Sequence, residues 1–432
     1  MAQSRRYFLL AAGAAAGTTL RAFGANDQIG FGFIGSGIRG TILLHEFQSL
    51  PGIRPVAVAD LYDGYLLRAK EQTGGKIDTT KDYRAVIGHK DVDVVVIATP
   101  DHWHTQLTVE ALQAGKHVYI EKPMTWSIEE GPKIIAAVKK SGKVLQVGSE
   151  TKTEPPTLKA REIVASGVLG KIDLIRMVNN RNTPEGAWEY PIPPDASEQT
   201  IDWPQFLGRA PKRAFDPKVF CRWRCWWEYS GGVATDLFVH QLTMLHEVMN
   251  VKGPSSVVSQ GGIYRWNDGR TVPDMMESSY DYGGAFQAYL CVNLSCGFRE
   301  HGMVIQGSEA TLVQDGERLT LYPEPRYENV QRYGSSSWPK AMRAKYFDEH
   351  GWSPDGRPLH PPPPRKNPEE IKYEPGPSHY EYFLKSLRDG LPSQENEEDG
   401  HFAAGAAHLA NLAYRRGRRV RWDLETNQVS EG

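Results

Sequence analysis

The sequence predicts an α/β protein in which a doubly wound parallel sheet is followed by a second, α+β domain whose sheet is mostly antiparallel. Three observations predict this fold class. A strand, a glycine turn and a helix follow one another over residues 28–50, strand and helix patterns then alternate as far as residue 147, and consecutive strand patterns begin after residue 149. Because 432 residues are enough for two domains, we divide the chain at 26–148 and 149–432.

Composition excludes several classes of protein. With 50 Lys+Arg against 52 Asp+Glu, the formal net charge is −2, so no nucleic-acid partner is expected. Four cysteines in so long a chain do not make a disulfide framework. We interpret them as free thiols, although an oxidising compartment would leave a disulfide open. They are Cys221, Cys225, Cys291 and Cys296.

The first 25 residues predict a twin-arginine signal peptide. Arg5 and Arg6 precede an uncharged stretch at 7–20, and small residues follow around Ala25. That stretch is shorter than the roughly 20 residues of a membrane-spanning helix, and no later segment is long and apolar enough, so no integral membrane segment is expected. We therefore expect export by the twin-arginine machinery, to the periplasm or otherwise out of the cytoplasm. An amphipathic N-terminal helix is the alternative.

The first strand, at residues 28–34, leads into a glycine turn of the dinucleotide-binding kind. Its sequence is Gly35-Ser36-Gly37-Ile38-Arg39-Gly40. Such glycines permit a tight turn, a close approach of backbone to pyrophosphate, and close packing of helix on strand. Asp60 ends the second strand, at 54–59, where a carboxylate accepts hydrogen bonds from ribose hydroxyls and repels a 2′-phosphate. NAD is thus favoured, while Arg39 keeps NADP open, and a glycine turn without a ligand is the alternative.

Further strands at 92–99, 117–120 and 143–147 alternate with helices at 105–114 and 128–140. Ligands of doubly wound sheets lie at the carboxyl ends of the strands. Polar groups follow two of these strands, and we expect them at the cofactor: Thr99, Pro100, His104, Glu121 and Lys122.

The second domain begins with a helix at 156–166. Strand patterns follow at 172–179, 256–264, 277–282, 287–294, 302–307 and 311–313, with gaps that suit hairpins. A Pro-rich segment at about 323–377 is expected to be an ordered surface loop or a subunit contact, in a chain that we expect to be a homo-oligomer. Two helices, at 378–388 and 400–416, close the sequence.

These motifs together resemble the Gfo/Idh/MocA superfamily of sugar and inositol oxidoreductases. The resemblance rests on the glycine turn, on Ala98-Thr99-Pro100 with His104, and on residues 115–123, which end in Glu-Lys-Pro; it continues through residues 230–240. It implies an N-terminal Rossmann domain that binds NAD and a C-terminal domain with a large open sheet that binds a carbohydrate or polyol substrate.

Asp236 and His240 are four residues apart at the start of a predicted helix, 235–250, so the two side chains would share one face. A carboxylate beside an imidazole sets its tautomer and raises its basicity, which suits removal of a proton from a hydroxyl group. The resemblance implies that Lys122, Asp236 and His240 are the catalytic set. A surface pair on a helix is the alternative. Members of the family often carry an Asp where this chain has Thr243, which bears on substrate identity.

Five tryptophans precede the Asp236 helix within residues 188–227. Flat rings stack on sugar faces and arginines bind hydroxyls or carboxylates, so we assign Trp223 and Arg224 to the substrate, with core packing as the alternative. His102, His104 and His240 do not have the spacing of a zinc site, and no metal is expected.

Export bears on the chemistry. Since the periplasm holds little free nicotinamide, we expect NAD to be tightly bound and regenerated in place. An oxidoreductase that acts on a sugar or polyol is the first hypothesis. A redox-neutral, NAD-dependent glycosidase or lyase is the second, and a non-catalytic sugar-binding relative is the third.

Overall fold

The computed structural model describes residues 28–298, 300, 302–324, 330–359 and 367–432. The predicted signal peptide at 1–25 lies outside these residues. In the described residues no helix is both long and apolar enough to cross a membrane.

The first sheet has six strands in the order β3-β2-β1-β4-β5-β6, and all of its pairs are parallel. It confirms the predicted doubly wound sheet. Every residue of β1, β4 and β5 is buried, as expected for strands covered on both faces. The strands are β1 (Ile29–Ile34), β2 (Ile53–Ala59), β3 (Asp78–Thr80), β4 (Val94–Ile97), β5 (His117–Ile120) and β6 (Leu145–Val147).

Five α-helices connect these strands. One of them, α4, begins at Asp101 and not at the predicted residue 105, with Pro100 as its N-cap. Proline is tolerated at the start of a helix, because the N–H that it lacks would have no partner within the helix there. The helices are α1 (Ile38–Ser49), α2 (Asp63–Gln72), α3 (Tyr83–Ile87), α4 (Asp101–Gln113) and α5 (Gly131–Ser141).

The second sheet has ten strands in the order β14-β13-β12-β11-β7-β10-β9-β8-β15-β16. All neighbours are antiparallel except β7 and β10, which confirms the mostly antiparallel prediction. The sequence prediction lacked β13 to β16, which are short strands at the two ends of the sheet. The ten strands are β7 (Ile172–Asn180), β8 (Ser256–Gly262), β9 (Met275–Asp281), β10 (Gln287–Asn293), β11 (Met303–Gly307), β12 (Ala310–Asp315), β13 (Arg318–Pro323), β14 (Glu369–Ile371), β15 (Val420–Asp423) and β16 (Gln428–Glu431).

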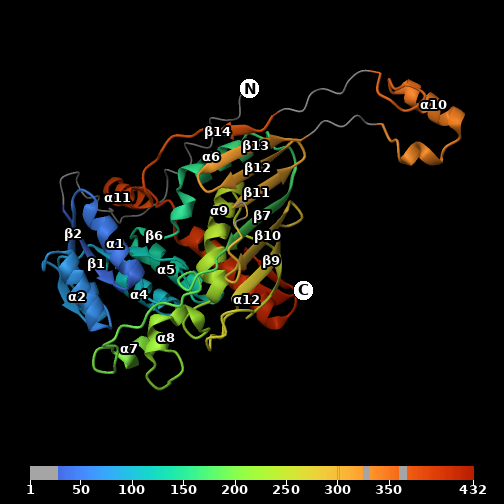
Figure 1. Ribbon diagram of the computed structural model, residues 1–432. Coiled ribbons are helices and arrows are strands. Elements are labelled where there is room, and N and C mark those ends of the chain that lie inside the picture. The colour runs from blue at the N-terminus through green and yellow to red at the C-terminus, as the bar shows by residue number, and fades with distance from the viewer. Residues whose placement is uncertain (1–27, 299, 301, 325–329, 360–366) are drawn as a thin grey trace.

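Helices α6 (Pro155–Ala165), α9 (Val239–Met249) and α12 (Glu397–Arg416) lie between the two sheets (Figure 1). Alanines of α12, among them Ala406 and Ala410, are fully buried in the core of the second domain together with Leu242 and Leu290. Small side chains let the helix approach the sheet closely. Two short helices, α7 (Trp203–Leu207) and α8 (Pro217–Cys221), lie below the first domain in the view of Figure 1.

Helix α11 (His379–Asp389) belongs in space to the first domain, although its sequence follows the second. Tyr380, Phe383 and Leu387 lie on one face of the helix and are buried against the first domain. The ring of Phe47, on α1, meets that of Tyr380 edge-on at 5.2 Å. The chain therefore returns to the cofactor domain, so the two domains are interleaved near residue 380.

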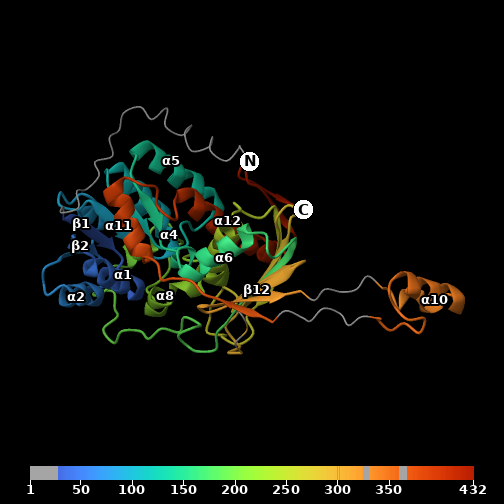
Figure 2. The ribbon, with the colours of Figure 1, turned by 90° about the horizontal axis from the view of Figure 1, so that it is seen from above.

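The predicted Pro-rich loop contains regular structure. Helix α10 (Lys340–Glu349) and its flanking turns, within 330–359, stand apart from the body of the molecule in both views (Figures 1 and 2). Phe347 is buried in this lobe against Trp352. The segment returns as β14, which pairs with β13.

Candidate active site

The glycine turn between β1 and α1 has the geometry that its sequence predicts. Gly35 has a φ of +90°, and a Cβ there would lie 2.5 Å from the carbonyl oxygen of Ala98. A Cβ on Gly40 would lie 2.0 Å from the oxygen of Gly35. By contrast, a Cβ on Gly37 would meet only the Tyr65 ring, at 3.5 Å. The first and third glycines are thus required by packing, and the second leaves open space above the backbone.

That open space lies at the N-terminus of α1. The N-cap residue is Gly37, which has no side chain to satisfy the first N–H groups of the helix. These groups and the positive end of the helix dipole suit a phosphate. Ile38, in the first turn, is exposed and lines the same cavity.

Asp60 fixes the turn from the end of β2. Its carboxylate accepts hydrogen bonds from the backbone N–H of Ser36 at 2.6 Å and from that of Tyr62 at 3.0 Å. Burial raises the pKa of Asp60, and these two backbone hydrogen bonds oppose that rise. Ser36 is itself buried and contributes its backbone, while Asp60 lines the cavity.

A cavity of about 290 Å³ joins these parts. Open backbone at a helix N-terminus and a carboxylate at the end of the next strand fit the phosphates and a ribose of a dinucleotide. The expected cofactor residues that line this cavity are Gly35, Gly37, Ile38, Arg39, Asp60, Thr99 and Pro100.

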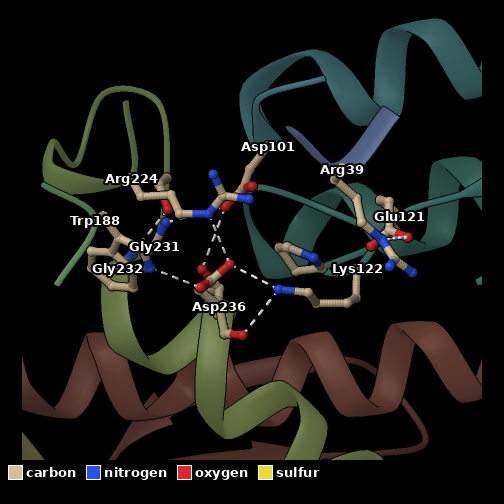
Figure 3. A network of polar contacts seen from close by, with 12 residues as sticks. Arg39, Asp101, Glu121, Lys122, Trp188, Arg224, Gly231, Gly232 and Asp236 are labelled. Atoms are coloured by element: carbon tan, nitrogen blue, oxygen red, sulfur yellow. Dashed lines mark hydrogen bonds and ion pairs between the residues drawn. The ribbon is translucent and has the colours of Figure 1, made fainter. Parts of the chain in front are cut away.

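Arg39 lies at the inner end of this cavity. Its Nε donates to Oε1 of Glu121 at 2.7 Å, and its Nη2 pairs with Glu150 and lies 3.3 Å from the hydroxyl of Tyr380. Burial disfavours the guanidinium charge, but Glu121 and Glu150 raise the pKa of Arg39 above its usual value. The guanidinium is therefore held by two carboxylates (Figure 3 shows the pair with Glu121).

His104 differs in its contacts from the expectation. Its Nδ1 lies 2.7 Å from the carbonyl oxygen of Pro123, and its Nε2 lies 2.9 Å from that of Thr99. Burial lowers the pKa of His104 to about 4. The ring lines neither the cofactor cavity nor the chamber beside it. It instead joins the loops that follow β4 and β5, which positions Thr99 and Lys122.

A second cavity of about 390 Å³, the reaction chamber, adjoins the cofactor cavity. The two share Arg39, Ala98, Thr99, Tyr190, Trp223 and Arg224. Asp236 is the centre of its polar network (Figure 3). Its Oδ1 accepts from Lys122 Nζ at 2.8 Å and from Arg224 Nε at 3.1 Å, and its Oδ2 accepts from Trp188 Nε1 at 3.1 Å. Burial opposes ionisation, but Lys122 and Arg224 hold the pKa of Asp236 well below its usual range.

The expected contact between Asp236 and His240 is not made in the described structure. Both line the chamber, but Nδ1 of His240 has no hydrogen-bond partner, and the Asp236 carboxylate is taken up by the three donors above. The reason is local. A π-helical turn, η4 (Ala234–Phe238), precedes α9, and its wider winding changes the register that a continuous α-helix would give. Burial lowers the pKa of His240 to about 3, so its ring is neutral.

Two residues of the network were not predicted. Asp101 is buried behind Asp236 and accepts weakly, at 3.4 Å, from the N–H of Gly231 and the hydroxyl of Thr235. Burial and then Asp236 raise the pKa of Asp101 to about 7. In sequence it precedes the helix predicted at 105–114, and nothing distinguishes it from other polar residues after a strand. Trp188 has a φ of +64°, uncommon for a bulky residue, and only its place in the tryptophan-rich segment drew attention to it.

Trp223 and Arg224 lie between the two cavities. The Arg224 guanidinium lies 4.2 Å from the centre of the Trp223 ring, while its Nε donates to Asp236. Arg224 is thus held by protein groups on two sides. In the described residues no group of three or more His, Cys, Asp or Glu side chains could hold a metal ion, and the four cysteines are free thiols.

A dinucleotide cavity that adjoins a polar chamber between two domains is typical of oxidoreductases that use a nicotinamide cofactor. The family described as "Oxidoreductase family, NAD-binding Rossmann fold" matches residues 29–149, and "Oxidoreductase family, C-terminal alpha/beta domain" matches residues 161–421. The chain therefore belongs to the Gfo/Idh/MocA family, which confirms the resemblance. Its N-terminal domain is an NAD-binding domain.

Curated relatives match over part of their length. The chain is 30% identical over 157 residues to "Uncharacterized oxidoreductase YrbE" of Bacillus subtilis (strain 168), which covers 36% of this chain and 46% of that protein. It is 28% identical over 154 residues to a "Glycosyl hydrolase family 109 protein" of Shewanella baltica, covering 34% of each. The chain thus spans less than half the length of these relatives.

Solved structures share the fold over nearly the whole chain. A levoglucosan dehydrogenase in complex with NADH and levoglucosan is 18% identical, with a TM-score of 0.65, and covers 91% of this chain and 99% of its own. An aldose-aldose oxidoreductase from Caulobacter crescentus has the same identity, TM-score and coverage. At this identity the likeness shows the fold alone.

Proposed function

We propose that the protein transfers a hydride between a tightly bound NAD and a hydroxyl-bearing carbon of a sugar or polyol. The observation that carries the proposal is the ion pair of Lys122 and Asp236, at 2.8 Å, in a chamber that shares its wall with the cofactor cavity. A buried cation at this boundary suits an oxygen that gains negative charge during oxidation.

The residues of the chamber have different roles toward the substrate hydroxyl. When NAD is bound, its nicotinamide accepts the hydride or returns it. Asp236 stays ionised and aims the Lys122 ammonium, which donates a hydrogen bond to the reacting oxygen. His240, neutral and with Nδ1 unpartnered, accepts the proton of the hydroxyl. Trp223 presents a ring face to the sugar at the boundary of the two cavities.

The same contacts favour NAD over NADP. The Asp60 carboxylate lines the cofactor cavity at the end of β2, a position that suits ribose hydroxyls, and it would repel a 2′-phosphate. Arg39 does not compensate, because Glu121 and Glu150 already neutralise its guanidinium.

A second candidate is a redox-neutral glycosidase or lyase, in which oxidation, elimination and return of the hydride cleave a glycoside. The glycosyl hydrolase family 109 relative supports it. The two candidates differ in products, because only the glycosidase releases an aglycone without a net change in nicotinamide. A non-catalytic role fits less well with a buried ion pair at the cofactor boundary.

A spectrum tests the proposal. Protein purified without added nucleotide is expected to carry nicotinamide, whose absorbance changes on addition of free sugars, polyols or glycosides. Lys122→Met and His240→Asn are expected to keep the bound cofactor and to lose that change. Protein without bound nicotinamide, active only with excess free NAD, would contradict tight binding. Variants as active as the wild type would contradict the assigned roles.

We also propose export to the periplasm through the twin-arginine machinery, and a homo-oligomer. Arg5 and Arg6 support the first, and the lobe at 330–359 that stands apart from the body supports the second. Replacing both arginines by lysine should keep the protein in the cytoplasmic fraction. Light scattering should give more than one chain's mass.

A further inference from the structure

A third cavity continues from the reaction chamber on the side away from the cofactor. Its volume is about 1030 Å³, and we call it the outer cavity. It shares four residues with the chamber: Thr151, Glu154, Arg181 and His240. The three cavities therefore lie in series, and a molecule that reacts beside Lys122 can extend past His240 into the outer cavity.

The outer cavity is lined by polar side chains. Thr151, Asn179, Asn180, Gln241 and Gln314 all line it. Amide and hydroxyl groups provide both donors and acceptors of hydrogen bonds. A lining of this kind suits a ligand rich in hydroxyl groups.

The charge of the outer cavity limits the ligand further. Three carboxylates and one guanidinium line it: Glu154, Glu300, Glu317 and Arg181. Burial raises the pKa of Glu154, and the negative charges of Glu150 and Glu317 raise it further. The wall near Glu154 is thus negative, and an anionic substituent there would be repelled.

We infer that the outer cavity binds a neutral sugar unit joined to the reacting sugar, so that the preferred substrates are disaccharides or longer glycosides and nucleotide-linked sugars are poor substrates. The inference rests on the proposed function, since it takes the reacting sugar to lie in the chamber. It adds a second subsite and a selection by charge.

Matched substrates test the inference. The NAD-loaded protein is mixed with glucose, galactose and N-acetylglucosamine, with cellobiose, lactose and N,N′-diacetylchitobiose, and with the three corresponding UDP-sugars. Nicotinamide absorbance and product masses report turnover, and calorimetry reports binding. For the sugar that reacts, we expect the disaccharide to exceed both the free sugar and the UDP-sugar in kcat/KM by about tenfold or more.

A groove-filling variant ties that preference to the outer cavity. Met244 lines it one helical turn after His240, while Met249 is on the same helix and lines none of the three cavities. Both are half-buried against the same core. Met244→Trp should lower kcat/KM and affinity for the disaccharide about tenfold and leave the free sugar within twofold, while Met249→Trp changes neither. Tyr373 lines the outer cavity and neither of the other two, so Tyr373→Ala should weaken disaccharide binding in the same selective way.

The outcomes separate the two claims. Three results would overturn the inference and leave hydride transfer standing. The disaccharide could have a kcat/KM no higher than that of the free sugar, or the UDP-sugar could have a higher kcat/KM than both. The third is a Met244→Trp variant that lowers kcat/KM equally for all substrates. Met244-dependent disaccharide binding without any change in nicotinamide would support the outer subsite and contradict the proposed function. Absence of both binding and turnover across the nine compounds would contradict both.

Discussion

The cofactor cradle and the reaction chamber share a wall, yet they are built in different ways. The cradle comes from one strand–turn–helix unit plus Asp60, and backbone geometry decides it, through Gly35 and Gly40. The chamber gathers side chains from the loop after β5, from α4, from η4 and from the tryptophan-rich segment, so tertiary packing decides it. The comparison teaches that a site built from backbone does not tolerate a side chain where the backbone is closely packed, as at Gly35 and Gly40, while a side-chain network can lose one member and keep its fold.

Substitution of the glycines should have the largest effect and separates packing from ligand binding. Gly40→Ala places a Cβ 2.0 Å from a backbone oxygen, and we expect a loss of about 3 kcal/mol or failure to fold. Gly37→Ala is the matched control, because its Cβ meets only Tyr65 at 3.5 Å.

Thermal unfolding with and without bound NAD measures both variants. Gly37→Ala should unfold like the wild type without NAD and should lose most of the stabilisation that NAD gives. If both alanines were equally destabilising without NAD, the distinction between the glycines would be wrong.

Removal of the Lys122 ammonium should have the next largest effect, and on activity only. Lys122→Met leaves Asp236 with Arg224 and Trp188, so the carboxylate stays paired. We expect kcat to fall about 10²- to 10³-fold while bound nicotinamide is unchanged. Single-turnover absorbance gives the rate, and release by acid gives the cofactor content. Loss of the cofactor in this variant would show that the two regions are not separable.

The outcome for Asp236 and His240 shows where sequence reasoning reached and where it stopped. The cradle could be predicted because its glycines lie within six consecutive residues and their spacing is the signal of the turn. The strand ends that carry Thr99 and Lys122 could be predicted from strand alternation. The direction of the Asp236 side chain could not, because the π-helical turn η4 sets it and its partners lie as far away as Lys122 and Trp188. The packing of α11 on the first domain could not be predicted either, because periodicity identifies the apolar face of a helix but not the surface that covers it.

Asp101 gives the chamber a dependence on pH that the cradle's glycines lack. Its pKa of about 7 in the folded state lies above the unfolded value of about 4. The contribution of Asp101 to the free energy of unfolding is therefore fully present below about pH 4, where the carboxyl group is protonated in both states. That contribution is lost as the pH rises from about 4 through about 7. Asp101→Asn removes this loss. The variant should gain stability relative to the wild type between pH 5 and pH 8, by at most about 3 kcal/mol at one pKa unit per roughly 1.4 kcal/mol. Denaturant unfolding at both pH values measures it, and a difference that is constant or opposite in sign would contradict it.

The smallest effect is expected at Arg39, which contacts both regions. Because two carboxylates hold its guanidinium, Arg39→Ala should change the ratio of NAD to NADP affinity less than about threefold, whereas Asp60→Ser should raise relative NADP affinity about tenfold or more. Titration of nucleotide-free protein with each cofactor gives the ratios. A large gain of NADP discrimination in Arg39→Ala would mean that the guanidinium reaches the adenosine ribose.

The central claim is that the cofactor bound in the cradle reacts with a sugar held in the chamber. Mixing the NAD-loaded protein with a substrate deuterated at the oxidised carbon tests it most directly. We predict that the deuterium appears on the bound nicotinamide, seen by mass spectrometry of the released cofactor, and that Lys122→Met with equal cofactor content transfers it at least about a hundredfold more slowly. Substrate turnover without deuterium on the nicotinamide, or equal transfer in the variant, would contradict the account.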